Sequence, residues 1–462
     1  MSNFKEKYIG DKAFYRRVLL LVLPMILQAG VTNFVSMIDN IMVGQIGTAQ
    51  MSGVSIVNQF VFVFNITVFG AMSGPGIFGA QFFGKGDHEG QRYTFRYRLI
   101  CCAAIIGAGM LILWLFREPL ISLYLSKDDS PEAIAATLGY GLDYLGVVLF
   151  SLIPFAIGQA YSSVVKECGE TLIPMLGSVA AVGVNLVLDY GLIFGRLGMP
   201  EMGVKGAALA TVIAKVIEAL VVVIWAHTHP DKNRYIVGLF RHFTIPKTLA
   251  WDIFKKSLPL LINEFLWSAG MSVIAQCYSV RGLDVVAARN IGNTITNLFS
   301  VVYVQMGACI GILLGQKLGA GELTEARDWS HKLTFFTLVM SVIVGLLMLP
   351  IAGIFPGIYN TEPAVKSLAS YMILICALAM PMWSYTNAAY FTIRSGGRTG
   401  ITFLFDFGFT WLLQIPLAFG LSHFTSLDIH ILYAVVVYAE MIKAVVGYLM
   451  MKSGMWVRRI VA

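Results

Sequence analysis

The amino-acid sequence predicts an all-α integral membrane protein whose twelve transmembrane helices form two pseudo-symmetric six-helix lobes. Three observations predict this fold: the apolar composition, the spacing of long apolar segments, and a repeat that relates the two halves of the chain. Of the 462 residues, 57% are hydrophobic and 13% are charged, whereas soluble domains carry about 25% charged residues. This composition is typical of a polytopic membrane protein.

The apolar residues fall into segments of about 20 residues or more, the length that a helix needs to cross a bilayer. Short loops with Gly, Pro and charged residues separate these segments. The first segment continues past Pro24 without a small-residue cleavage site, so we interpret it as a helix and not as a signal peptide. The expected spans lie near 14–43, 52–82, 94–116, 134–162, 172–195, 204–226, 254–280, 286–315, 331–355, 365–392, 401–422 and 428–451.

The net charge of +7 comes from basic residues that gather on one side of the predicted membrane. If both termini are cytoplasmic, 24 of the 33 Lys and Arg residues lie on that side and seven lie opposite, while Lys215 and Lys443 fall within spans. Cytoplasmic loops of membrane proteins carry such an excess. We therefore expect a multi-pass protein of the cell inner (plasma) membrane with both termini in the cytoplasm, surrounded by membrane lipids and without a nucleic-acid partner.

A repeat relates the two halves of the chain. A shift of 235 positions aligns Pro24 with Pro259 and Gln81 with Gln316, and a shift of 228 aligns Lys215 with Lys443. The repeat predicts an N-terminal lobe at 1–226, a cytoplasmic linker at 227–253 and a C-terminal lobe at 254–462. Because each lobe has an even number of spans, both have the same orientation, and alternating access between two rocking lobes is expected.

Several ionisable residues lie within the predicted spans. An ionised side chain near a helix centre costs about 2.5 to 3.5 kcal/mol on insertion scales, so each is expected to be protonated, paired or facing water. Lys215 with Glu218 and Glu440 with Lys443 are three residues apart and are expected to form ion pairs. The others in these spans are the acids Asp39, Asp189, Glu264 and Asp406.

The first-lobe acids Asp39 and Asp189 are candidates for cation coupling. Asp39 has no basic residue within one helical turn, and Asp189 follows Asn185 by four residues, so the amide and the carboxylate share one helix face. The three residues are therefore expected to hold a proton or a small cation such as sodium. A structural hydrogen-bond network is the alternative for Asp39.

The second-lobe acids Glu264 and Asp406 are candidates for substrate binding. They lack local counter-charges, and the repeat places no acid opposite any of the four isolated acids, which favours different tasks for the two lobes. Aromatic residues of the same lobe are expected to line a surface for planar cations, although core packing is the alternative for each. These aromatic residues are Trp267, Tyr278, Tyr303, Trp383 and Tyr385.

Pro24 and Pro259 lie within the first span of each lobe, where a proline removes a backbone hydrogen bond and permits a kink. The kink is either a hinge or a fixed bend, and the sequence leaves both open.

Other function classes lack their motifs. The segment GAQFFGKG at 79–86 lacks the final Ser or Thr of a phosphate-binding loop, so an ATPase is excluded. The six cysteines show no metal-ligand spacing, and the histidines lie in or near loops without a catalytic set. We expect neither an enzyme nor an organic cofactor, with protons and/or sodium ions as the coupling ion.

Several motifs in order resemble those of the multidrug and toxic compound extrusion (MATE) family over nearly the full chain. They are SMIDNIMVGQIG around Asp39, GAQFFGKGD after the second span, NLVLDYGLIFG followed by GVKGAALAT, LPLLINEFLWS around Glu264, and IRSGGRT before the eleventh span. The resemblance implies the MATE fold and a monomeric antiporter that exports cationic, lipophilic drugs or toxins in exchange for protons or sodium.

The resemblance also implies roles for individual residues. Asp39, Asn185 and Asp189 match the first-lobe cation site of prokaryotic members, and Thr211 is a weaker match to the same network. Glu264 matches an acid of NorM-type members, within a sequence that looks more like the DinF-like and MepA-like branch. One alternative is a flippase of lipid-linked precursors from the same superfamily, whose basic cavity contrasts with the acidic excess here. A membrane-embedded enzyme is the alternative from another class.

Overall fold

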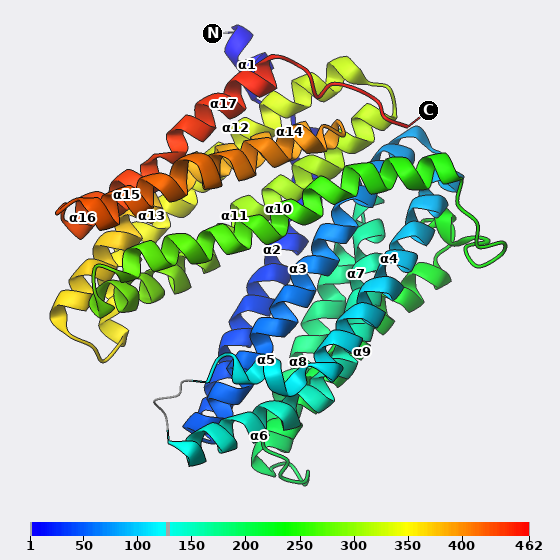
Figure 1. The fold of residues 1–462 in the computed structure, drawn as a ribbon. Coiled ribbons are helices and arrows are strands. Elements are labelled where there is room, and N and C mark those ends of the chain that lie inside the picture. Colours follow the sequence, from blue (N-terminus) through cyan, green and yellow to red (C-terminus); the bar gives the residue numbers. More distant parts are fainter. Residues whose placement is uncertain (1, 126–129, 462) are drawn as a thin grey trace. The chain divides into compact units, whose positions relative to one another are not determined.

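The computed structural model describes residues 2–125 and 130–461. Within these ranges all regular elements are helical, and twelve helices are long and apolar enough to cross a membrane (Figure 1). The prediction of an all-α protein with twelve spans is therefore confirmed. The spans are Phe4–Gly44, Thr48–Lys85, His88–Leu115, Pro131–Glu167, Leu172–Phe194, Val204–Thr228, Lys247–Ser279, Leu283–Gly319, Leu323–Ile358, Pro363–Ser395, Thr399–Phe424 and Ile429–Lys452.

Some spans consist of more than one helical element. The elements are α1 (Ser2–Tyr8), α2 (Lys12–Gly44), α3 (Thr48–Lys85), α4 (His88–Leu115), α5 (Arg117–Ser122), α6 (Pro131–Val148), η1 (Leu149–Ser151), α7 (Leu152–Glu167), α8 (Leu172–Phe194), α9 (Val204–Thr228), η2 (Arg234–Ile236), α10 (Lys247–Ser279), α11 (Leu283–Gly319), α12 (Leu323–Ile354), η3 (Phe355–Ile358), α13 (Pro363–Ser395), α14 (Thr399–Phe403), η4 (Leu404–Gly408), η5 (Thr410–Gln414), α15 (Ile415–Phe424), α16 (Ile429–Tyr438) and α17 (Glu440–Lys452). Many helices extend a turn or more past the predicted apolar segments, because their polar ends continue the backbone hydrogen-bond pattern.

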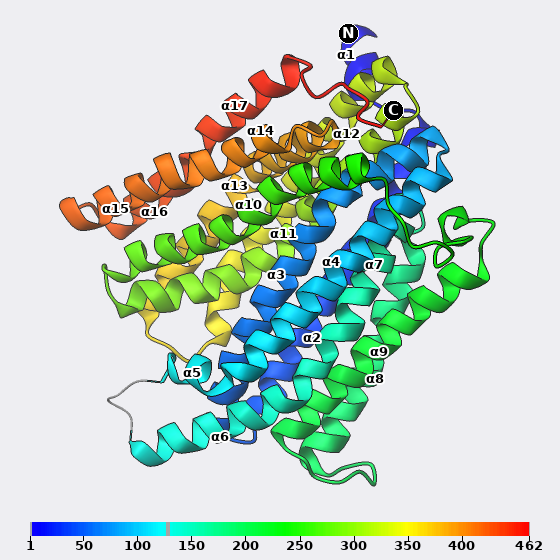
Figure 2. The same ribbon diagram turned by 45° about the vertical axis from the view of Figure 1, so that its right-hand side comes forward.

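The helices form two compact units. Unit 1 comprises Met1–Val22, Ala80–Asp87 and Asp252–Ala462, and unit 2 comprises Leu23–Gly79 and His88–Trp251. In unit 2, α4, α7, α8 and α9 lie alongside one another, as both views show (Figure 2). In unit 1, α13 packs along α11 and α12.

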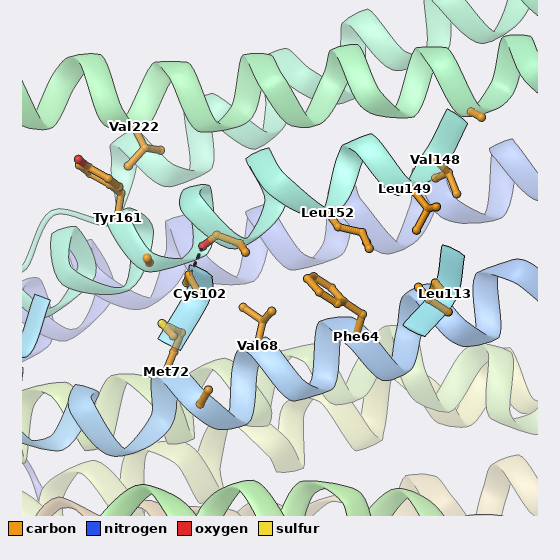
Figure 3. Packing of buried hydrophobic residues seen from close by; sticks show 14 of the residues in the cluster. Phe64, Val68, Met72, Cys102, Leu113, Val148, Leu149, Leu152, Tyr161 and Val222 are labelled. Carbon is orange, nitrogen blue, oxygen red and sulfur yellow. Dashed lines mark hydrogen bonds between the residues drawn. The ribbon is translucent and has the colours of Figure 1, made fainter. Parts of the chain in front are cut away.

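The core of unit 2 is built around one face of α3. Phe64, Val68 and Met72 follow one another at intervals of four residues, which places them on the same side of the helix, and all three are buried (Figure 3). The thiol of Cys102 on α4 donates a 3.4 Å hydrogen bond to the carbonyl oxygen of Ala156 on α7. These contacts join α3, α4 and α7 into one hydrophobic core.

Small residues allow close helix packing in unit 2. A Cβ atom added at Gly206 of α9 would lie 2.6 Å from the carbonyl oxygen of Leu192 on α8, so only glycine fits there. Such small-residue contacts are typical of helix pairs in membranes, where close backbone approach supplies van der Waals packing.

The glycine-rich motif at the end of α3 also serves packing. A Cβ at Gly84 would collide with the backbone of Gln316 on α11, and a Cβ at Gly319 would collide with the backbone of Gln81 on α3. The two ends therefore cross at close range within unit 1. The glycines near Lys85 are therefore explained by this helix crossing, and the resemblance of the segment to a phosphate-binding loop does not require a bound phosphate.

The two glutamines at this crossing, which the repeat aligned, each fix a different part of the chain. Gln316 Oε1 accepts a 2.9 Å hydrogen bond from Arg17 near the start of α2. Gln81 Oε1 accepts a 2.8 Å hydrogen bond from the backbone amide of Ile460 in the C-terminal segment. The start of α2 and the C-terminal segment thus lie at the same end of unit 1 (Figure 1).

A buried ion pair connects α4 with α7 in unit 2. Arg98 Nη2 lies 2.7 Å and 2.8 Å from the two carboxylate oxygens of Glu167, and the two side chains are 0% and 6% exposed. Arg98 Nη1 also donates a 2.8 Å hydrogen bond to Ser163. A Cβ at Gly79 would collide with Glu167, so the pair also fixes the distance to α3.

We expect Glu167→Gln to destabilise unit 2 strongly, because the substitution leaves the charge of Arg98 buried without a counter-ion. Breaking a buried pair in this way typically costs about 3 to 5 kcal/mol. The measurement is the thermal unfolding midpoint of the purified protein in detergent. Glu170→Gln is the matched control, since it breaks the exposed Glu170–Lys232 pair and is expected to change the midpoint little. Equal midpoints for the two variants would contradict this role of Glu167.

Candidate functional site

Unit 2 contains a cluster of polar side chains on α2 and α8, with Asp39 and Asp189 at its centre. The carboxyl groups of these two residues are neighbours that interact electrostatically, and Asn185 lies beside Asp189 on the same face of α8. Asn185 and Asp189 are 6% and 2% exposed. The structure therefore brings the three residues with predicted coupling roles into one place.

The two carboxyl groups need a further positive species. Oδ1 of Asp39 and Oδ1 of Asp189 are both buried without a hydrogen-bond partner. Two ionised carboxylates repel each other at this range, and neither carries a hydrogen to donate. A shared proton satisfies the pair, and so does a sodium ion, because hard cations prefer carboxylate and amide oxygens. The arrangement is chemically suited to binding one small cation.

Two residues that the sequence reasoning did not assign to the site lie next to the pair. The hydroxyl of Tyr144 on α6 donates a 3.2 Å hydrogen bond to Asn58 Oδ1 on α3. Thr211 on α9 and both aspartates are also among the neighbours of this hydroxyl. Asn58 carried a signal, because the repeat aligns it with Asn293, whereas nothing in the sequence distinguished Tyr144.

A second polar chain of unit 2 satisfies the basic residue on α9. Lys215 Nζ lies 2.8 Å from Glu218 Oε2, which confirms the predicted ion pair. Glu218 Oε1 accepts a 2.5 Å hydrogen bond from Ser178, which in turn accepts a 2.7 Å hydrogen bond from Gln28. Lys215 is thus held by its own partner and acts on Asp39 only through its electric field.

Unit 1 contains a separate polar cluster around Asp406. Lys443 Nζ lies 2.6 Å from Asp406 Oδ1 and 3.5 Å from Glu440 Oε1, and Asn263 Nδ2 donates a 2.8 Å hydrogen bond to Asp406 Oδ2. Asp406 has no local counter-charge, as the sequence indicated, but the fold supplies a distant one, and the predicted Glu440–Lys443 pair is confirmed. The partner of Asp406 lies 37 residues away in sequence, where helical spacing gives no signal, and packing of the helices brings the two together.

The backbone is irregular beside this cluster. Asp406 lies in the π-helical element η4, and Glu440 follows the break between α16 and α17 at Ala439. Single π turns recur at functional sites because the extra residue redirects side chains. The contact between Asp406 and Lys443 thus lies where the helical backbone of both spans is irregular.

Glu264 on α10 differs from Asp406. Among the described residues, none forms a hydrogen bond or an ion pair with the carboxylate of Glu264. Arg394 and Asp406 influence this carboxylate only electrostatically, from a longer distance. The carboxylate is half-buried. Of these two second-lobe acids, Glu264 is therefore the one without a contacting counter-charge, and it retains the capacity to bind a cation.

The five predicted aromatic residues occupy different environments in unit 1. Trp267 is 45% exposed, whereas Tyr278 is 3% exposed and packs against Tyr433 in the core. Tyr303 and Trp383 pack on the same core, and Tyr385 is half-buried. Only Trp267 therefore presents a large surface, three residues after Glu264 and thus near it on α10.

The comparison with known families supports the repeat found in the sequence. One family model, MatE, matches twice, over residues 24–191 and 259–419. The matches begin 235 positions apart, at Pro24 and Pro259, and end 228 positions apart, at Gly191 and Phe419. These are the two shifts that the sequence repeat gave. The chain belongs to the MatE family. Members of this family are transporters and not enzymes, as the sequence predicted.

MatE relatives cover nearly all of the chain. A probable multidrug resistance protein NorM from Thermotoga maritima is 22% identical over 453 residues, with 96% of this chain and 94% of the relative covered. A crystal structure of MATE in the bent conformation has a TM-score of 0.84 at 19% identity, covering 96% and 95%. An outward-facing multidrug resistance MATE transporter of the MOP superfamily has a TM-score of 0.83 at 19% identity, covering 96% of each chain. The predicted MATE fold is therefore confirmed.

We expect Lys443→Gln to destabilise the MatE fold, because Asp406 and Glu440 would then share a buried site without a cation. The double variant Asp406→Asn/Lys443→Gln removes both partners of the closest pair, so it is expected to be more stable than Lys443→Gln alone. The measurement is the unfolding midpoint in a titration with sodium dodecyl sulfate. Lys205→Gln, which breaks an exposed pair with Asp143, is the control. If the double variant lost as much stability as the sum of the losses of Asp406→Asn and Lys443→Gln, the two side chains would not stabilise each other and the prediction would be contradicted.

Proposed function

We propose that this MatE chain is a multidrug efflux antiporter that exports cationic, lipophilic small molecules in exchange for protons or sodium ions. The observation that carries the proposal is the pair of facing carboxyl groups of Asp39 and Asp189, each with a buried oxygen that has no partner. Two relatives, named as probable multidrug resistance proteins in Thermotoga maritima and Bacillus subtilis, support export of drugs.

Coupling follows from the charge of this pair. In an antiporter the ion and the cargo bias the same conformational equilibrium, and each shifts it only through its difference in affinity between the states. Binding of a proton or a sodium ion at the site formed by Asp39, Asn185 and Asp189 neutralises one negative charge of the two carboxylates. Thr211 and Tyr144 hold the hydrogen-bond network beside them. Burial makes it costly for both carboxyl groups to stay ionised without a cation. A conformation that encloses the pair therefore binds the ion with a different affinity from one that exposes the pair to water.

Cargo recognition is assigned to the acids and aromatic residues of the second half. Glu264 supplies the uncompensated charge, and Trp267 supplies an exposed ring for a planar cation. Asp406 contributes to the cargo site when Lys443 releases it. Tyr303, Trp383 and Tyr385, which are only partly buried, are the remaining proposed lining residues, whereas Tyr278 belongs to the core.

The conformational change is assigned to two lobes. We propose lobes at 1–226 and 254–462 joined by a linker at 227–253, with Pro24 and Pro259 as hinges. α2 continues through Pro24 as one helix, although the ring removes a hydrogen bond there. The chain is proposed to act as a monomer in the cell inner membrane.

Asp39→Asn is expected to abolish gradient-driven efflux while cargo binding remains, because the amide keeps the shape of the side chain but cannot exchange a proton or neutralise sodium. The measurement is efflux of a cationic dye from proteoliposomes under a proton gradient and under a sodium gradient. The control is Asp143→Asn, which changes an exposed acid of the same unit. Efflux at the wild-type rate from folded Asp39→Asn protein would falsify the coupling role.

Glu264→Gln is expected to weaken binding of monovalent cationic dyes about tenfold or more, in line with loss of a partner for a partly buried charge. Binding of neutral dyes of similar size is expected to change little. Equilibrium binding to the purified protein, followed by dye fluorescence, is the measurement. Equal losses for charged and neutral dyes would show that Glu264 only shapes the site.

Both termini are proposed to be cytoplasmic, because the basic residues gather on that side. We expect a membrane-impermeant maleimide to label Asp231→Cys in inverted vesicles and Leu197→Cys in intact cells, since both positions are exposed in loops on opposite sides. Labelling of Asp231→Cys from outside intact cells would reverse the orientation.

A further inference from the structure

The segment between α9 and α10 is folded onto unit 2 by one arginine. The guanidinium of Arg96 on α4 donates hydrogen bonds to four backbone carbonyl oxygens of this segment, those of Gly238, Leu239, Arg241 and Thr244, at 2.8 to 3.0 Å. Arg96 itself is only 4% exposed. The segment is therefore a fixed structure and not an extended tether.

The inner face of the segment is a small hydrophobic core. Tyr235 in η2 is 0% exposed and its ring meets that of Phe95 on α4 at 5.4 Å. Leu239 is 1% exposed, and Arg92 on α4 donates a 3.3 Å hydrogen bond to the carbonyl oxygen of Tyr235. Burial of these side chains, together with the bonds from Arg96, determines which side chains face outward.

The outer face combines apolar and basic side chains. Val237, Phe240 and Phe243 are 57%, 64% and 44% exposed, and Arg234 and Arg241 of the same segment are exposed as well. We call these five residues the linker surface. Phe240 stacks on His227 at 6.2 Å and Arg96 lies 5.8 Å from the ring of Phe243, yet both phenylalanines remain exposed to the surroundings. Aromatic and basic residues together are typical of the membrane–water interface.

We propose that the linker surface binds anionic phospholipids, with Arg234 and Arg241 on the head-group phosphates and Phe240 and Phe243 at the boundary of the acyl chains. The segment connects the helix that ends at Thr228 with the helix that begins at Lys247, and the proposal places it beside the head groups at this end of the two spans.

The backbone of the segment also suits this position. Near hydrocarbon an irregular loop needs protein partners for its carbonyl groups, and Arg96 supplies them for four. Basic residues next to a membrane attract anionic lipids, so the charge of the linker surface selects these lipids over zwitterionic ones.

The test uses the purified full-length protein in detergent micelles with equal amounts of phosphatidylglycerol and phosphatidylcholine. Native mass spectrometry counts the lipids of each kind that stay bound. We expect the wild-type protein to retain phosphatidylglycerol preferentially, and Arg234→Gln/Arg241→Gln to lower that preference roughly tenfold. Phe240→Ser/Phe243→Ser is expected to lower retention of both lipids. Since all four side chains are exposed, these variants are expected to fold.

The matched control is Lys12→Gln/Arg16→Gln, which removes two exposed basic residues at the start of α2. It is expected to keep the wild-type preference. The proposal is overturned if the wild-type protein shows no preference for phosphatidylglycerol, if the control loses as much as the Arg234/Arg241 variant, or if the phenylalanine variant retains both lipids as the wild type does.

Discussion

Polar groups that are withdrawn from water must find partners within the protein, and most of this structure follows from that constraint. It accounts for the helical fold, since helices satisfy their own backbone in hydrocarbon. It also accounts for the contacts of Arg98 with Glu167 and of Lys443 with Asp406. Among the acidic residues that the structure describes, only Asp39 and Asp189 have a buried carboxylate oxygen without a partner. These two residues therefore remain able to bind a cation from outside the protein.

The two copies of the repeat keep their scaffold but differ in their charges. Gln81 and Gln316 occupy corresponding positions and each fixes a different chain segment. Each aligned lysine has an acidic partner on its own helix, Glu218 for Lys215 and Glu440 for Lys443, but only Lys443 also binds an acid on a neighbouring span, Asp406. One duplicated framework thus supports an unsatisfied acid pair in unit 2 and a compensated acid in unit 1.

The basic end of α4 shows why a count of charges is incomplete. Arg96 and Arg98 contributed to the positive excess that predicted the orientation, yet they are 4% and 0% exposed. Arg98 neutralises Glu167, and Arg96 organises the backbone of the segment that follows α9. A charge near the end of a span can therefore serve packing as well as topology.

The sequence by itself determined the number and approximate limits of the spans, the repeat, the family, and the Lys215–Glu218 and Glu440–Lys443 pairs. These features depend on local composition, on helical periodicity or on similarity along the chain, all of which are visible in one dimension. Asn185 and Asp189 were recognisable together because they are separated by one helical turn. The tertiary structure alone decided that Asp39 meets Asp189, that Tyr144 lies beside them, that Lys443 compensates Asp406, and that Tyr278 is in the core. Such contacts join residues tens to more than a hundred positions apart, and their geometry depends on helix crossings that no local pattern encodes.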